Sequence, residues 1–290
     1  MSSFETASQI QRDSLQRREG GGALAARLLG VSEVINLQNV SVVRGGKSII
    51  DSLTFSVGPT ERWVVLGANG AGKTTLLKLA AAQIQPSSGS ATLLGQRLGE
   101  VNVFELRTRI GFASSALAAQ IPNSETVLNA VMTASYGITG RWNEEYDSID
   151  ERRARRVLGE WKLSSFEDRA FGTLSDGERK RVQIARSVMT DPELLLLDEP
   201  VASLDLAARE LTLQLLSGYA QATEAPAMVM VTHHLEEIPP GFTHALLMQD
   251  GKVMARGEIG MTLTSASISE AFNHPLTLNY QNQRFSAVSS

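Results

Sequence analysis

Cysteine is absent from the 290 residues of this chain, and only four residues are histidine. Without thiols the chain can form neither a disulfide nor a thiolate metal site, and four histidines argue against a multi-histidine metal site. This composition is compatible with a reducing compartment.

Long apolar runs are also missing. The longest ones, at residues 194–197 and 225–231, fall far short of the roughly 20 residues that a membrane-spanning helix needs. Residues 23–29 (ALAARLL) are too short for a signal peptide and contain an arginine. We therefore expect a soluble or peripheral protein.

An excess of positive charge is the third missing feature. The 27 basic residues are outnumbered by 31 acidic ones, which gives a net charge of −4. Such a chain has no basic field for general binding of DNA or RNA, so no nucleic-acid partner is expected. The length suits one large α/β domain, alone or with a smaller insert, rather than two full catalytic domains.

The most informative stretch that is present is LGANGAGKTTL, at residues 66–76. It follows an apolar run at 63–66 that suits a buried strand, and residues 76–82 suit a helix. The spacing G-x-x-x-x-G-K-[ST] supplies inward backbone N–H groups, a helix N-terminus, a cation and a hydroxyl for Mg²⁺. The phosphate-binding candidates are Gly67, Asn69, Gly70, Ala71, Gly72, Lys73, Thr74 and Thr75. Kinases, GTPases and many ATPases share this pattern, so alone it does not settle the function.

The surrounding pattern predicts an α/β fold with a mostly parallel sheet. Apolar runs at 193–197 and 228–232 are typical of buried strands, and they alternate with helical segments. An antiparallel pair of strands is predicted at 35–43 and 48–57, joined by two glycines. Another hairpin is expected to begin at residues 245–248.

The ends and the middle of the chain differ from this core. Residues 1–33 are rich in Ser, Gln, Arg and Gly, which predicts a mostly disordered extension. Helices are expected at 125–134 and 150–163, the second with an arginine face that is either solvated or a docking surface for a partner. Residues 258–290 are expected to form a small appendage with a helix around 267–272.

Two acidic residues follow the apolar run of four leucines. Asp198 lies at the carboxyl end of the predicted strand, where ligands of open α/β sheets gather, and it can hold Mg²⁺ opposite a phosphate. Glu199 points the other way if the strand geometry persists. It is then placed to act as a general base or to orient a water molecule.

The sequence LSDGE contains a capping box, in which Ser175 caps a helix and Glu178 reaches back to the cap N–H. A helix N-terminus is also an anion site, and the chain already has one at residues 66–76. Two phosphate-directed helix ends in one domain make sense if one of them serves the nucleotide of a neighbouring chain.

Five motifs, GANGAGKTT, LSDGE, LLLLDEP, ASLD and VTHH, occur in this order and resemble those of the ATP-binding subunit of the ABC ATPase superfamily. The resemblance covers residues 34–257. It implies a P-loop NTPase core, an antiparallel β-subdomain and a helical insert at about 116–175. It also implies a homo- or heterodimer in which two ATP molecules lie between the phosphate loop of one subunit and the LSDGE motif of the other.

The resemblance also implies roles for single residues. Lys73 would grip the β- and γ-phosphates, and Thr74 and Asp198 would hold Mg²⁺. Glu199 would be the catalytic carboxylate. His233 would contact the γ-phosphate as the switch histidine.

Further roles fall on the dimer contacts. Ser175 and Gly177 would bind the γ-phosphate held by the partner, and Asp205 would couple the two ATP sites. His234 matches no position of the family and is expected to be structural or exposed.

The sequence departs from the family at two nucleotide contacts. Arg44 occupies the place of an aromatic residue that stacks on adenine, and a guanidinium plane can also lie on a purine. Ser114 and Ser115 occupy the place of a glutamine that contacts Mg²⁺ and links the nucleotide to the membrane partner. Gln120 is the nearest glutamine.

The signature motif departs as well, because Asp176 and Glu178 replace the commoner Gly and Gln. These carboxylates would repel a γ-phosphate unless Glu178 is engaged in the capping box and Asp176 points to solvent.

The resemblance predicts an ATP hydrolase that energises a separate transmembrane permease, located in the cytoplasm and peripheral on the inner face of the cell membrane. The alternative is a soluble, non-transport ABC-type ATPase that remodels or regulates a cytosolic complex. A P-loop kinase or GTPase would leave the LSDGE motif and His233 unexplained. The short C-terminal segment is more like that of importers, for metal complexes or oxyanions.

Overall fold

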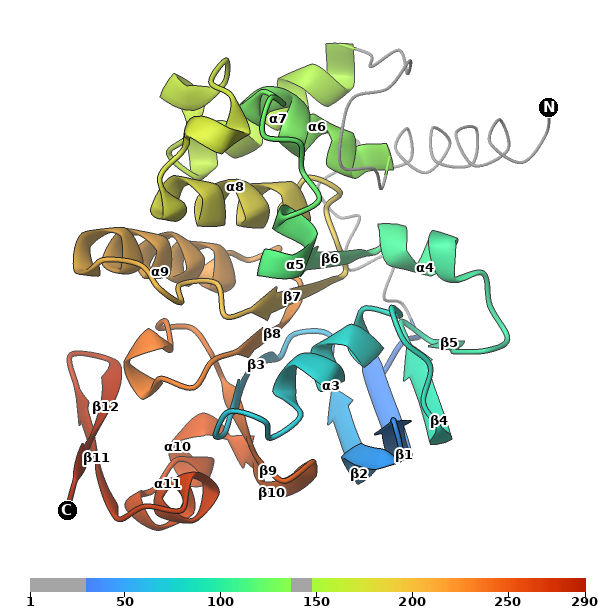
Figure 1. Ribbon diagram of the computed structural model, residues 1–290, viewed down its shortest axis with the longest axis vertical. Coiled ribbons are helices and arrows are strands. Elements are labelled where there is room, and N and C mark those ends of the chain that lie inside the picture. The colour runs from blue at the N-terminus through green and yellow to red at the C-terminus, as the bar shows by residue number, and fades with distance from the viewer. Residues whose placement is uncertain (1–29, 137–147) are drawn as a thin grey trace.

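The computed structural model describes residues 30–136 and 148–290. Residues 1–29 of the predicted extension therefore lie outside the described residues. A six-stranded sheet in the order β10-β9-β3-β8-β7-β6 forms the centre (Figure 1). Its strands are β3 (Arg62–Leu66), β6 (Ile110–Ala113), β7 (Leu194–Asp198), β8 (Ala227–Val231), β9 (His244–Gln249) and β10 (Lys252–Glu258). All neighbours in it are parallel except the edge strand β10, which confirms the predicted α/β fold class.

Both faces of the central sheet are buried. Leu195 and Leu197 of β7 belong to the hydrophobic cluster on one face, whereas Leu194 and Leu196 belong to the cluster on the other. Successive side chains of a strand point to opposite faces, so a continuous apolar run is what a doubly covered parallel strand requires. These strands are therefore apolar along their length, and the polar side chains of the candidate site come at their carboxyl ends.

Helices and a second sheet cover the two faces (Figure 1). The helices are α3 (Lys73–Ala80), α4 (Val103–Thr108), α5 (Ser115–Ala118), α6 (Val127–Met132), α7 (Ser148–Glu160), α8 (Asp176–Val188), α9 (Leu206–Gln221), α10 (Ile259–Thr262) and α11 (Ser265–Phe272). Short 3₁₀ turns are η1 (Thr133–Tyr136), η2 (Ser164–Phe166), η3 (Phe171–Thr173) and η4 (Leu235–Glu237). Buried residues of α6, α7, α8 and α11 join one cluster, and those of α3 join the other.

The second sheet is antiparallel, in the order β2-β1-β4-β5. Its strands are β1 (Ile35–Arg44), β2 (Lys47–Val57), β4 (Ser88–Leu93) and β5 (Gln96–Arg97). The predicted pair is confirmed, with Gly45 and Gly46 at positive φ in the turn (56° and 78°). Buried residues of β1 and β2 share a cluster with α3, so this sheet packs beside the helix that follows the phosphate loop.

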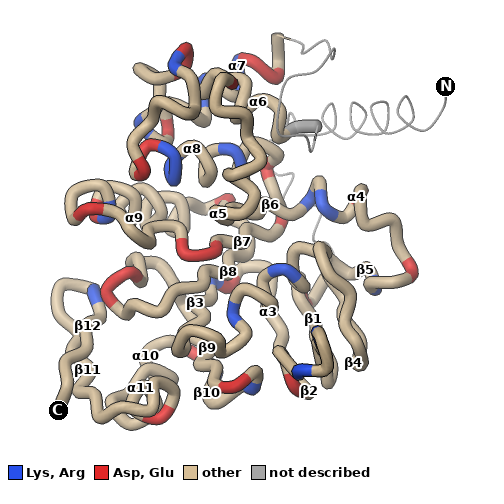
Figure 2. The backbone as a smooth tube through the Cα atoms, viewed as in Figure 1, with Lys and Arg blue, Asp and Glu red and all other residues tan. Residues whose placement is uncertain are grey.

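The helices between β6 and β7 confirm the expected amphipathic pattern. Helix α6 is shorter than predicted because Thr126 caps its start, accepting a hydrogen bond from the Asn129 N–H at 3.2 Å. On α7, Val157 is buried and Arg155 is exposed, with ion pairs to carboxylates on α7 and just beyond η2. Figure 2 shows charges of both signs along α7 and α8. The alternative of a docking surface on these arginines stays a prediction.

The C-terminal segment holds more structure than the predicted helix. Helix α11 is followed by a hairpin, β11 (Leu276–Gln281) and β12 (Arg284–Ser289). Arg284 ties this hairpin to the body, since it pairs with Glu210 of α9 at 2.9 Å and donates to the Glu236 carbonyl in η4. Strand β10 runs through Glu258, and the domain boundaries given above stay predictions.

Within residues 30–136 and 148–290, no helix combines the length and apolar character that crossing a membrane requires.

Candidate functional site

The phosphate loop follows β3 and is built so closely against its neighbours that only glycine fits. A Cβ on Gly67 would lie 2.2 Å from the Met248 carbonyl oxygen, and one on Gly72 would lie 2.8 Å from the Ile49 carbonyl oxygen. Both glycines also have positive φ, at 154° and 97°. The loop backbone is thereby pressed between β9 and β2, with its open side toward Asn69 and Gly70, which are exposed.

Lys73 begins α3 and folds its side chain back over the loop. Its Nζ donates to the carbonyl oxygens of Gly67 at 2.7 Å and Ala68 at 2.9 Å. Burial lowers the pKa of Lys73, and the charges of Glu199 and Asp198 act in the opposite direction. The loop thus holds a cation over its own backbone, where a phosphate needs one.

Asp198 ends β7 and faces the phosphate loop. Its Oδ1 accepts a hydrogen bond from the Thr74 hydroxyl at 3.1 Å. Burial raises the pKa of Asp198, with a smaller contribution from Glu199, while the Thr74 hydrogen bond lowers it. A carboxylate and a hydroxyl oxygen this close are donors that suit Mg²⁺, whose charge would offset the cost of burying the carboxylate.

Glu199 has a different partner from Asp198, namely His233, although strand geometry does not persist through Glu199. Its Oε1 lies 2.9 Å from His233 Nδ1, with both side chains half-buried. Glu199 adopts a φ of +48°, a conformation that costs a residue with a side chain about 1–3 kcal/mol. His234 is exposed, as expected, and its ring is tilted by 42° to that of His233, with 4.0 Å between the ring centroids.

The LSDGE motif forms the capping box that its sequence predicts. The Ser175 N–H donates to Glu178 Oε2 at 2.7 Å, and the Glu178 N–H donates to the Ser175 hydroxyl at 3.3 Å. The Asp176 side chain is 78% exposed and lies 3.9 Å from Arg179, so Glu178 is engaged in the capping box and Asp176 points to solvent, as the departure from the family's motif requires. A Cβ on Gly177 would lie 2.7 Å from Ala208 Cβ, so this glycine also lets α8 pack closely on α9.

The other predicted site residues lie apart from the phosphate loop and its carboxylates. Asp205 caps α9 by accepting a hydrogen bond from the Ala208 N–H at 2.8 Å, and Arg44 is exposed at the end of β1. Among the described residues, no hydrogen bond or ion pair joins Ser175 or Asp205 to the phosphate loop. One chain therefore presents a phosphate loop with its carboxylates, and separately an exposed helix cap.

A family model described as ABC transporter matches residues 50–202, which is more than half of the chain. The chain belongs to the ABC transporter family. It is an ATP-binding and ATP-hydrolysing subunit of that family.

Individual members of the ABC transporter family resemble the chain over most of its length. It is 37% identical to the ABC transporter ATP-binding protein YlmA of Bacillus subtilis (strain 168), over 87% of this chain and 95% of the relative. It is 34% identical to the phosphonates import ATP-binding protein PhnC of Pseudomonas putida, over 76% of this chain and 83% of the relative. A solved protein assigned to the metal-chelate type of ABC transporter superposes with a TM-score of 0.70 and 26% identity, covering 89% of this chain and 98% of that one.

The place of the family's glutamine is occupied differently in this ABC ATPase. Ser114 is buried and caps α5, accepting a hydrogen bond from the Leu117 N–H at 3.3 Å, and Gln120 is exposed beyond that helix. Ser115 instead accepts a hydrogen bond from Lys180 of α8 at 3.1 Å. Sequence reasoning missed Lys180, because a lysine five residues into a helix carries no signal that separates it from a solvated one.

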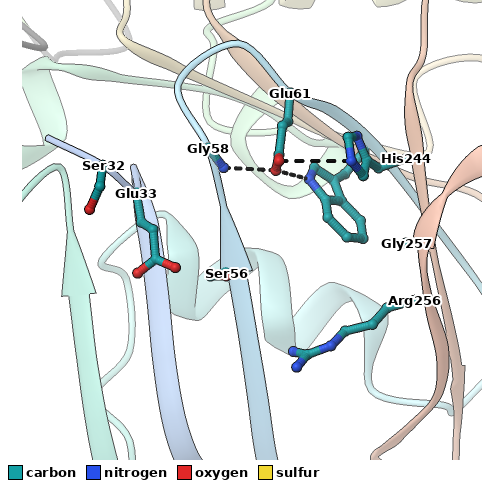
Figure 3. Close-up of a pocket in the computed structure, with 9 residues that line it drawn as sticks. Ser32, Glu33, Ser56, Gly58, Glu61, His244, Arg256 and Gly257 are labelled. Atoms are coloured by element: carbon teal, nitrogen blue, oxygen red, sulfur yellow. Dashed lines mark hydrogen bonds and ion pairs between the residues drawn. The ribbon is translucent and has the colours of Figure 1, made fainter.

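A separate pocket of about 390 Å³ lies at the amino end of β3, away from the phosphate loop (Figure 3). Glu61 lines this pocket and accepts hydrogen bonds from the Gly58 N–H and the Trp63 ring N–H, both at 2.8 Å. His244 stacks on Trp63 and lies 3.8 Å from Glu61. These groups contact one another, so the polar side chains form a structural network in this pocket.

Proposed function

We propose that this ABC ATPase works as a dimer that encloses two ATP molecules and energises a separate membrane permease. The single observation that supports it is the incomplete site: the chain carries a phosphate loop with Lys73, Asp198 and Glu199 together, and an exposed cap at Ser175 that contacts none of them. A second chain, either identical or different, supplies the cap that faces each nucleotide.

Within each site we assign the roles by chemistry. Lys73 moves from the loop carbonyls to the β- and γ-phosphates, whose charge is a better partner for an ammonium than neutral oxygens. Thr74 and Asp198 would hold Mg²⁺, which would neutralise charge at the phosphates. Glu199 accepts a proton from the attacking water or orients it, and His233 holds the Glu199 carboxylate and contacts the γ-phosphate.

The permease is the partner of this proposal, with the ATPase at the inner face of the membrane. The relative named for phosphonate import supports an importer. With the solved protein of the metal-chelate type, it supports a cargo that is an oxyanion or a metal complex chosen by the permease. A soluble, non-transport ATPase is not favoured, because the relatives are ATP-binding proteins of transporters. Affinity isolation from native membranes tests this step, and a partner set without any multi-span permease would contradict it.

The role of Glu199 is tested by Glu199→Gln. The variant keeps the size and the hydrogen bonds of the side chain but removes its basicity, so we expect ATP binding to persist and hydrolysis to fall by at least ~10²-fold. Because ATP then stays bound, a dimer should accumulate in size-exclusion chromatography with ATP and Mg²⁺. Glu100→Gln, on an exposed carboxylate paired with Arg97, is the matched control and should hydrolyse normally. Full turnover of Glu199→Gln would remove Glu199 from the mechanism.

A further inference from the structure

Lys180 makes two hydrogen bonds that join three parts of the site. It lies on α8, and its Nζ donates to the Ser115 hydroxyl at 3.1 Å and to the main-chain carbonyl oxygen of Glu199 at 2.9 Å. Ser115 is the first residue of α5, directly after β6, and Glu199 directly follows β7. One ammonium group therefore connects the helix of the LSDGE motif, the segment after β6 and the peptide of Glu199.

The Glu199 peptide is a place where such a bond matters. With a φ of +48° this residue lies outside the ordinary conformations of a glutamate, so its surroundings must hold it there. Its N–H donates to the Val231 carbonyl at 3.0 Å, and its carboxylate meets His233. Its carbonyl accepts from Lys180 and from the Ala202 N–H, the latter at 3.3 Å. Lys180 supplies the shorter of the two bonds at the carbonyl.

The electrostatic setting of Lys180 agrees with a fixed cation. Burial lowers the pKa of Lys180, and this is opposed by Glu199 and Asp198, followed by Glu237 and Asp176. A lysine that only covered the helix surface would leave its ammonium in water. Here the ammonium is turned from water toward the carboxylates at the carboxyl end of β7 and in the neighbouring loop.

We propose that Lys180 is a positioning residue for ATP hydrolysis. It binds Ser115 and the Glu199 carbonyl oxygen at the same time, so a displacement of the segment after β6 changes the position of the Glu199 carboxylate. In the family a glutamine in that segment links the nucleotide to the membrane partner, and in this chain serines stand in its place. A shift of α5 against α8 would then reach Glu199 through Lys180. The inference rests on the role of Glu199 proposed above.

The test is steady-state ATP hydrolysis by the full chain with the variants Lys180→Met, Lys180→Arg and Ser115→Ala. Lys180→Met keeps the length of the side chain but not its donors, and we expect kcat to fall about tenfold with KM for ATP unchanged, since a small misplacement of a catalytic group acts on turnover rather than on binding. Lys180→Arg retains the cation and should recover most of kcat. Lys162→Met, on an exposed lysine after α7, is the control and should equal the parent.

The coupling to Ser115 separates this role from a general effect on folding. Ser115→Ala should lower kcat by about threefold, and adding it to Lys180→Met should change nothing further, because both act through one connection. A kcat of Lys180→Met within twofold of the parent, additive effects of the two substitutions, or a rise in KM that matches the fall in kcat would each overturn the inference. If Lys180→Met does not fold, Ser115→Ala and Lys180→Arg still decide it, since an unchanged kcat for Ser115→Ala contradicts the connection. Loss of hydrolysis in Glu199→Gln alongside an unchanged Lys180→Met would refute this inference alone.

Discussion

Arg109 and Glu193 fix the relative position of β6 and β7 at the ends remote from the nucleotide. The guanidinium binds the carboxylate at two points, 2.8 and 2.7 Å, and the Glu193 side chain is only 2% exposed. The Glu193 N–H also donates to the Arg109 carbonyl at 2.9 Å. Because β6 leads to Ser115 and β7 leads to Glu199, this pair sets the register of both site segments.

We expect Glu193→Ala to lower the free energy of unfolding by about 3 kcal/mol, because it leaves a partly buried guanidinium without its partner. Urea unfolding followed by circular dichroism measures the loss. Glu100→Ala removes a carboxylate from an exposed pair with Arg97 and should cost less than about 0.5 kcal/mol. Equal stability of the two variants would show that the Arg109–Glu193 pair contributes no more than a surface pair.

Helix α8 carries both the LSDGE cap and Lys180, which reaches the segment of Glu199. Its first turn holds the capping box of Ser175 and Glu178, and Gly177 allows close packing on α9. One turn further along, Lys180 reaches Ser115 and Glu199. The helix whose cap we propose to face the partner's nucleotide is thus bonded to the segment of Glu199 in its own chain.

Glu178→Ala removes half of the capping box, and we expect a loss of about 1 kcal/mol in unfolding free energy together with slower ATP hydrolysis, because the first turn of α8 frays. The matched control is Glu178→Gln, since glutamine also accepts the hydrogen bond from the cap N–H. Denaturant unfolding and ATPase assays on both variants give the answer. Should Glu178→Ala match Glu178→Gln in both assays, the box would contribute nothing at this position.

At the scale of the whole molecule, each chain carries two parts of a nucleotide site that do not face each other. The phosphate loop follows β3. The LSDGE cap comes much later in the chain, at the start of α8, and packs against α9. Packing within the chain occupies both elements, so neither can move to the other without unfolding its cluster. This arrangement agrees with the proposal that a second chain completes the site.

The rate of hydrolysis per chain should therefore depend on protein concentration. We expect the rate per chain to fall much more steeply on dilution than ATP binding, measured with a fluorescent analogue, because Lys73 and its loop belong to one chain and still bind ATP in a monomer. Light scattering at the same concentrations reports the fraction of dimer. A rate per chain that is constant over dilution into monomers would contradict the dimeric site.

Local sequence patterns were enough to predict the fold class, the phosphate loop, the acidic pair at the end of β7 and the capping box. Each of these depends on neighbours along the chain: glycines at fixed spacing, an apolar run that ends in carboxylates, and a serine three residues before a glutamate. Asp198 and Glu199 have different partners, as expected, but the left-handed φ of Glu199 contributes to this separation, and strand alternation did not predict that conformation.

Packing between distant parts of the chain determines which lysine contacts the Glu199 carbonyl, where the Lys73 side chain lies and how the C-terminal hairpin docks. Lys180 and Ser115 are 65 positions apart, and Arg284 and Glu210 are 74 apart. Such pairs form only when packing brings two elements together, and a long flexible side chain can reach either solvent or a buried partner. The local pattern of a lysine or an arginine is the same in both cases, so the sequence could not distinguish them.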